Sequence, residues 1–147
     1  HRAAPKGIGN AKAIGNYSAS LLPQTKAKSQ GFNDMIYVHA KNEQYIEEMG
    51  AANLFVISNG EVLTPKLGGS ILDGVTRDSV ITVAQELLNL KVRETDIEVD
   101  TLLNADEVFC CGTAVTVTGV GKISTLDNEF RIGDGGFGEK TLKIKYN

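Results

Sequence analysis

Residues 53–64, NLFVISNGEVLT, predict the centre of the fold. The segments 53–57 and 61–64 are rich in apolar and β-branched side chains, which favour strands. Asn59 and Gly60 lie between them, and this dipeptide is a strong signal for a two-residue hairpin turn because both positions tolerate a positive φ. We therefore expect an antiparallel hairpin here.

Several other segments have the composition of strands. A turn at residues 41–44 separates the first two of them, and Gly112 and Gly119 interrupt the longest. These segments are residues 34–38, 45–48, 92–99, 107–120 and 130–132. Together with the hairpin they predict a mixed α/β (α+β) fold with mostly antiparallel strands and about three helices, the last at residues 139–146.

Two longer segments predict helices, residues 16–31 and 76–90. Pro23 predicts that the first one kinks or restarts with the proline in its first turn, since a proline inside a helix costs about 3 kcal/mol. Gly31 suits a helix C-terminus, and Asp100 suits the N-cap of a further helical turn. The side chains expected to pack in the core from the two helices are Leu21, Leu22, Ala27, Val80, Val83, Ala84, Leu87 and Leu88.

The composition favours one soluble domain with a real core, since 41% of the 147 residues are hydrophobic and 22% are charged. A net charge of -3 gives no basic footprint for nucleic acid, and no apolar run is long enough to span a membrane. The adjacent Cys110 and Cys111 predict free thiols in a strand and a reducing compartment. A chain that begins at His1 without an initiator methionine is expected to be a fragment or a processed form.

The stretch AKAIGNYS, residues 11–18, places Lys12 among small residues and after Gly7 and Gly9. Small neighbours let another molecule approach the backbone. A lysine in such a wall can lose its proton and attack a carbonyl as a neutral amine. Most lysines are solvated and inert, so the spacing alone leaves both interpretations of Lys12 open.

Residues 48–77 read EMGAANLFVISNGEVLTPKLGGSILDGVTR. This gapped string resembles the signature of the fold-type IV (class IV) pyridoxal-phosphate aminotransferases. Three further strings resemble the branched-chain amino-acid aminotransferases within that group: RAAPKGIGNAKAIGNYSASLLP at residues 2–23, ILDGVTRDSV at 71–80 and ADEVFCCGTAVTV at 105–117. The resemblance covers residues 2–138 and implies the family's large domain, a mostly antiparallel barrel-like sheet with flanking helices.

The resemblance implies pyridoxal 5′-phosphate as the cofactor and assigns a role to each matching residue. Lys12 matches the lysine that forms the Schiff base and then moves the substrate's α-proton. Tyr17 matches the tyrosine that hydrogen-bonds the phenolic oxygen of the ring. Glu48 matches the carboxylate that faces the pyridine nitrogen and favours the protonated ring, which is the electron sink. Without the resemblance, Tyr17 is interpreted as a core tyrosine and Glu48 as a surface carboxylate.

The phosphate and the substrate carboxylate have their own matching residues. The backbone N–H groups of Val75 and Thr76 open a helix, and a helix N-terminus suits a phosphate dianion. Thr113 matches the threonine whose hydroxyl also holds the phosphate. The N–H groups of the turn at Thr113 and Ala114 match those that receive the substrate carboxylate, whereas the plain interpretation of Gly112 is a bulge in a long strand. No metal ligand belongs to this set.

Two positions depart from the family pattern. Some branched-chain enzymes carry a redox Cys-x-x-Cys after the Gly-Thr-Ala turn, but Val115 and Thr118 stand there in this chain. The thiol switch is therefore expected to be absent. Ala51 stands where some members have threonine, so a side-chain contact to the substrate is expected to be missing.

The resemblance implies transfer of the amino group of L-leucine, L-isoleucine or L-valine to 2-oxoglutarate by ping-pong exchange in a homodimer or higher homo-oligomer. The compartment is expected to be intracellular, the cytoplasm or an organelle. Residues 1–147 are expected to form the large domain, with the small N-terminal domain absent and the last helix cut short, so the isolated chain should be inactive or weak. The alternatives are a D-amino-acid aminotransferase or an aminodeoxychorismate lyase, or a non-catalytic folded fragment.

Overall fold

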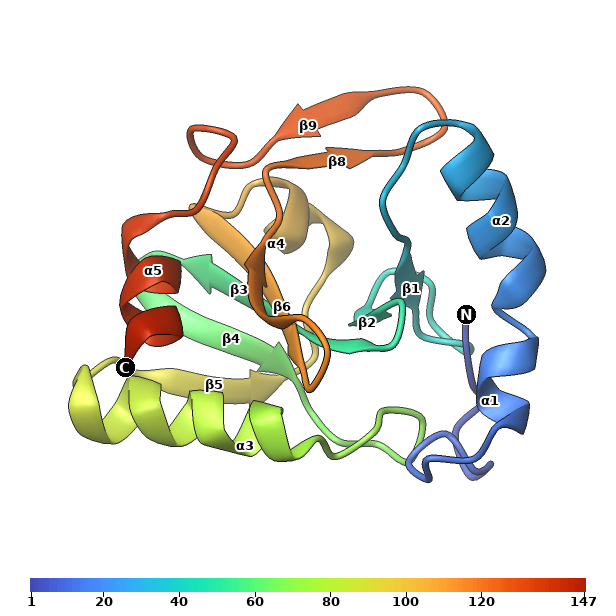
Figure 1. The fold of residues 1–147 in the computed structure, drawn as a ribbon, viewed down its shortest axis with the longest axis horizontal. Helices are drawn as coiled ribbons and strands as arrows, with labels where there is room; N and C mark the ends of the chain where they lie inside the picture. The colour runs from blue at the N-terminus through green and yellow to red at the C-terminus, as the bar shows by residue number, and fades with distance from the viewer.

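The computed structural model describes residues 1–147 and has a seven-stranded sheet at its centre (Figure 1). The strands of the chain are β1 (Ile36–Val38), β2 (Ile46–Met49), β3 (Ala52–Ser58), β4 (Glu61–Pro65), β5 (Val92–Thr95), β6 (Glu107–Gly112), β7 (Thr116–Gly119), β8 (Lys122–Ser124) and β9 (Glu129–Arg131). The helices are α1 (Gly15–Ser18), α2 (Leu21–Ser29), α3 (Val75–Thr82), α4 (Val99–Leu103) and α5 (Glu139–Tyr146), with a π-helical turn η1 (Val83–Leu87) after α3. None of the helices has both the length and the apolar character that a membrane span requires.

The central strand of the sheet is β3. Along one of its edges, β2 pairs with its first residues and β4 with its last, while β6 pairs along the opposite edge and continues to β7. Every pair in this sheet is antiparallel except β4 with β5. The prediction of a mixed fold with mostly antiparallel strands is confirmed. In the turn between β3 and β4, Asn59 and Gly60 both have positive φ, as the predicted hairpin requires.

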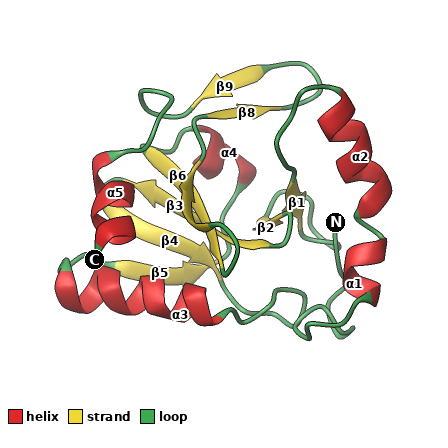
Figure 2. Cartoon of the chain, viewed as in Figure 1, coloured by secondary structure: helices red, strands yellow, loops and turns green.

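Two apolar layers lie on the two faces of the sheet, because successive side chains of a strand point to opposite faces. Helices α3 and α5 lie on one face of the sheet (Figure 2). The layer under them contains the stacked rings of Phe55 and Phe109, whose centroids are 4.9 Å apart. The other layer includes Leu102 of α4. The adjacent Cys110 and Cys111 fall into different layers and are both free, as predicted.

The first predicted helix is two helices. The chain breaks between α1 and α2, and Pro23 takes the third position of α2, in its first turn. Gly31 has φ +88° and follows the end of α2, where the N–H groups of Gly31 and Phe32 donate to the carbonyls of Lys28 and Ala27. This is the glycine-terminated cap that was predicted. The expectation of a buried leucine face was wrong, since only Ala27 is buried and the leucines at positions 21 and 22 are exposed.

The second predicted helix begins at Val75, one residue before its predicted start, and its winding changes from α-helical to π-helical before its end. Regular α-helix stops at Thr82, and η1 carries the chain to Leu87, which is 64% exposed instead of packing in the core. The expected N-cap at Asp100 was also wrong. Glu98, with extended backbone, is the N-cap residue of α4. The strand predicted at residues 92–99 is shorter in the structure and ends at Thr95. The count of about three helices was low, because the first predicted helix forms both α1 and α2, with the restart that Pro23 predicted, and the helical turn predicted after residue 99 forms the short helix α4.

The N-terminus of α5 receives its cap from the start of β6. The Glu107 carboxylate accepts hydrogen bonds from the N–H of Lys140 at 3.0 Å, the N–H of Thr141 at 2.8 Å and the Thr141 hydroxyl at 2.7 Å. Replacing Glu107 with alanine leaves these donors without a partner. We expect Glu107→Ala to lower the free energy of unfolding by about 1–3 kcal/mol. Urea unfolding measures this, with Glu86→Ala on the exposed side of η1 as the control; equal losses in the two variants would contradict the capping role.

Candidate active site

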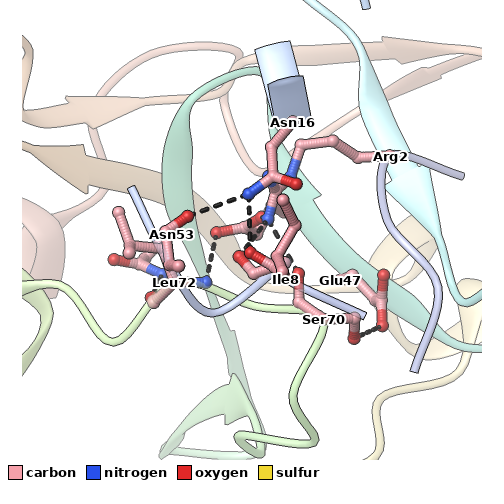
Figure 3. A network of polar contacts seen from close by, with 10 residues as sticks. Arg2, Ile8, Asn16, Glu47, Asn53, Ser70 and Leu72 are labelled. Carbon is pink, nitrogen blue, oxygen red and sulfur yellow. Dashed lines mark hydrogen bonds and ion pairs between the residues drawn. The ribbon is translucent and has the colours of Figure 1, made fainter. Parts of the chain in front are cut away.

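A buried ion pair lies beside the first helices of the chain. The Arg2 guanidinium pairs with the Glu48 carboxylate, and both side chains are at most 5% exposed. Arg2 also donates to the backbone oxygens of Gly9 at 3.1 Å and Ser70 at 2.7 Å. Arg2 therefore joins the N-terminal segment, strand β2 and the loop before α3 at one point (Figure 3).

Glu48 is held on its other side by the loop that leads to α3. The Leu72 N–H donates to Glu48 Oε1 at 3.2 Å. Burial raises the pKa of the Glu48 carboxyl, and the charge of Arg2 opposes that rise. Without the resemblance, Glu48 was predicted to be a surface carboxylate, but it is buried. In a low dielectric its charge interacts strongly with a nearby cation.

The loop that carries Lys12 is held in place by Asn16. The Asn16 amide donates to the carbonyls of Ile8 at 2.7 Å and Ala11 at 2.8 Å. The Asn10 N–H donates to the Gly69 carbonyl at 3.2 Å, so this loop is tied to the loop before α3. Lys12 itself is exposed and takes part in none of the ion pairs. Tyr17 is half-buried on α1.

The N-terminus of α3 carries no side-chain cap. Gly74 is the N-cap residue with extended backbone, and it has no side chain with which to cap the first N–H groups. Val75 is 84% exposed, and Thr76 follows it at the open end of the helix. Uncapped N–H groups together with the positive end of the helix dipole attract an anion.

The turn that contains Thr113 and Ala114 joins β6 to β7, and both residues are exposed. Gly112 is the last residue of β6 and pairs with Thr116, so it ends a strand and is not a bulge inside one. The turn lies at the end of the sheet where β2 ends and β3 begins, because Cys111 pairs with Asn53, which also pairs with Glu48. The loop before α3 and its N-cap Gly74 contact Asn53. The N-terminus of α3 therefore lies at the same end of the sheet as Glu48 and the turn at 113–114.

The structure adds residues that the sequence interpretation did not assign. Arg2 is the first residue of the string at 2–23 and Asn53 lies within the string at 48–77, but the resemblance assigned a role to neither of them. Ser70 donates its hydroxyl to the buried carboxylate of Glu47, the neighbour of Glu48. A buried glutamate is rarely without a partner, so the Glu47-Glu48 pair in the sequence was a signal that partners had to be sought.

The two thiols lie near this end of the sheet but are chemically quiet. Burial raises the pKa of Cys110 to about 11 and that of Cys111 to about 12. The thiolate is the reactive form. We expect iodoacetamide to label neither cysteine of the folded chain at neutral pH and both after unfolding in urea, as read by mass spectrometry. Rapid labelling of the folded chain would contradict the burial of these groups.

Comparison with known proteins places the chain among aminotransferases. Residues 2–123 match the family model described as amino-transferase class IV. The chain is 44% identical over 98% of its length to the branched-chain-amino-acid aminotransferase 5, chloroplastic, of Arabidopsis thaliana, of which it covers 34%. It therefore spans about a third of the length of that curated relative.

Two solved structures give the same result at the level of the fold. The branched-chain amino acid aminotransferase from Escherichia coli aligns with a TM-score of 0.86 at 39% identity, over 98% of this chain and 47% of that one. The branched-chain amino acid aminotransferase from Thermobaculum terrenum, in its PLP-form, aligns with a TM-score of 0.85 at 27% identity, over 96% of this chain and 44% of that one.

Proposed function

Since the chain belongs to the amino-transferase class IV family, we propose that it is the cofactor-binding large domain of a branched-chain amino-acid aminotransferase that uses pyridoxal 5′-phosphate. The observation that carries this proposal is the 44% identity to a branched-chain enzyme across 98% of the chain. The substrates proposed are L-leucine, L-isoleucine or L-valine with 2-oxoglutarate. We assign residues 1–147 to one domain of that enzyme.

The donor groups at the end of the sheet fit such a cofactor. A phosphate dianion fits the uncapped N–H groups at Val75 and Thr76, with the Thr113 hydroxyl as a second donor. A protonated ring nitrogen fits the buried Glu48 carboxylate. An aldehyde fits Lys12, whose ammonium group has no ion-pair partner to give up.

Each residue then has a physical task. Bound pyridoxal phosphate supplies a ring that withdraws electrons from the substrate's α-carbon. Lys12 would hold the cofactor through Nζ and, as a free amine, would move the substrate's α-proton. Arg2 keeps Glu48 in place. Glu48 would keep a proton on the ring nitrogen, and Tyr17 would donate to the phenolic oxygen. The N–H groups of the turn at 113–114 orient the substrate carboxylate.

The similarity to branched-chain enzymes favours a branched-chain aminotransferase over a D-amino-acid aminotransferase or an aminodeoxychorismate lyase. The compartment we propose is intracellular, the cytoplasm or an organelle, in line with the chloroplastic relative. A homodimer is proposed as the working assembly. The lack of the redox cysteine pair and the alanine at position 51 remain as departures of this chain from the family pattern.

The experiment compares leucine with D-alanine as amino donor to 2-oxoglutarate, after cofactor loading of the purified protein. Borohydride reduction and peptide mapping are performed in parallel. The proposal expects cofactor fixed to Lys12 and, at the low rate expected of the isolated chain, transfer from leucine only. Transfer from D-alanine would move the assignment to another class IV enzyme. Absence of fixed cofactor would support a non-catalytic folded domain.

A further inference from the structure

Asn53 lies between the Glu48 carboxylate and the N-terminus of α3, which are proposed to hold the ring nitrogen and the phosphate of the cofactor. It is 6% exposed and lies on β3 directly opposite Glu48, so the two side chains share one face of the sheet. Its amide donates to the Leu72 carbonyl at 2.9 Å. Figure 3 shows Asn53 and Leu72 side by side.

Leu72 is held from two sides. Its carbonyl accepts from Asn53, and its N–H donates to Glu48. Two residues earlier, the Ser70 hydroxyl donates to Glu47, so strand β2 holds this loop through both of its carboxylates. Asn53 holds the same loop from the central strand β3.

The contact continues to the helix. A Cβ at position 74 would overlap the Asn53 side-chain oxygen, so Gly74 packs directly on Asn53 because it lacks a side chain. Gly74 is the N-cap of α3. The buried side chain of Asn53 therefore contacts both Leu72, which donates to Glu48, and Gly74, which begins α3.

We propose that Asn53 is a positioning residue that sets the separation between the Glu48 carboxylate and the open N-terminus of α3. The inference rests on the proposed function, since pyridoxal phosphate carries its ring nitrogen and its phosphate at a fixed separation. Asn53 touches neither end of that ligand. It makes the site selective for a ligand that reaches both ends, because a rigid ligand gains from both anchors only when their spacing matches.

A second buried hydrogen bond offers a matched control. The hydroxyl of Thr64, 1% exposed on β4, donates to the Leu54 carbonyl at 2.8 Å and has no hydrogen bond to the loop before α3. Thr64→Val and Asn53→Ala each remove one buried side-chain donor from the same sheet. A purely structural role for Asn53 would make the two variants behave alike. Asn53→Asp adds a test at constant volume, because the carboxylate cannot donate to Leu72.

The experiment measures the affinity of each variant for pyridoxal phosphate by absorbance titration. The affinity for inorganic phosphate is measured by amide shifts at Val75 and Thr76. We expect Asn53→Ala and Asn53→Asp to weaken pyridoxal phosphate binding by about tenfold or more. Asn53→Ala should leave the affinity for inorganic phosphate, which needs one anchor only, within about twofold of wild type. The carboxylate of Asn53→Asp lies against Gly74, the N-cap of α3, so this variant should weaken inorganic phosphate binding as well. Thr64→Val should leave both affinities within about twofold.

Amide hydrogen exchange in the cofactor-free protein gives a readout that does not depend on cofactor. Asn53→Ala should speed exchange at Leu72 by about tenfold, whereas Thr64→Val should not change it beyond its global loss of stability. Three results for Asn53→Ala would each overturn the inference. They are unchanged exchange at Leu72, an equal loss of affinity for pyridoxal phosphate and for inorganic phosphate, and an affinity for pyridoxal phosphate equal to that of wild type. A wild-type protein that binds no pyridoxal phosphate would overturn the proposed function and, with it, the ligand named here.

Discussion

Lys12→Ala is expected to abolish covalent attachment of pyridoxal phosphate after borohydride reduction. The reason is chemical, since alanine has no amine and the proposed bond forms at Lys12 Nζ. Mass mapping of the reduced protein measures the result as complete loss of the modified peptide. Lys26→Ala, on the exposed face of α2, is the control and should retain full labelling. Persistence of the label in Lys12→Ala would move the attachment to another lysine, with Lys26 and Lys28 the first to map.

The loss in Lys12→Ala can be attributed to the amine because the substitution disturbs little else. Lys12 is exposed and has no ion pair, so the free energy of unfolding should change by no more than about 0.5 kcal/mol. The loop keeps its hydrogen bonds from Asn16 to the carbonyls of Ile8 and Ala11. A large loss of stability in this variant would show that Lys12 has a structural role instead.

Glu48→Gln is expected to retain cofactor and to slow removal of the substrate's α-proton by about a hundredfold. A neutral amide cannot stabilise the protonated ring nitrogen as a carboxylate does. Half-reaction kinetics with leucine, followed through the cofactor spectrum, measure the rate. Glu43→Gln, exposed in the turn between β1 and β2, is the control. A rate equal to wild type would remove Glu48 from the site.

The same variant has a signature in the cofactor-free protein. The folded-state pKa of Glu48 is raised above its ordinary value of 4.5, mainly by burial. The folded state therefore binds the proton more tightly than the unfolded state does. The Glu48 contribution to stability is fully present below 4.5 and is lost as the pH rises through the folded pKa. Glu48→Gln should remove this component from unfolding curves measured between that pH and neutrality.

Arg2 determines how much stability the Glu48 substitution costs at neutral pH. Removing one partner of a buried ion pair leaves the other uncompensated, which costs about 3–5 kcal/mol, and the loss of the buried Glu48 charge offsets part of this cost at neutral pH because burial raises the pKa of that carboxyl. We expect the Arg2→Met, Glu48→Gln double variant to recover part of the stability that Glu48→Gln loses, since no buried charge remains unpaired. A double-mutant cycle in urea measures this coupling. Additive losses would show that the pair is not coupled.

The sequence by itself determined the features that depend on neighbours along the chain. The hairpin at Asn59-Gly60 follows from the tolerance of that dipeptide for positive φ, and both φ values are positive in the structure. The restart of the helix at Pro23 and the cap at Gly31 follow from ring geometry and the missing Cβ. The family followed from a gapped string whose spacing is visible without coordinates, and the match over residues 2–123 confirmed it.

Tertiary structure alone decided which apolar side chains are buried. Leu22 fits a helix but is 79% exposed, whereas Ala27 on the same helix is buried. Nothing in α2 distinguishes them, because burial depends on which face the rest of the chain covers. The same holds for Leu87, which is exposed at the end of the π-helical turn η1, whereas its neighbour Leu88 packs against the core.

Tertiary structure also decided the partners within the candidate site. Arg2 meets Glu48 and Asn53 meets Leu72, and in each pair the two residues are far apart in the sequence. Local propensity carries no information about such pairs, since the pairing exists only after the sheet brings β2, β3 and the loop before α3 to one place. The chemistry of each residue could be predicted from its type, but the raised pKa of the Glu48 carboxyl and its hydrogen bond from Leu72 arise from burial and distance, which only the folded chain creates.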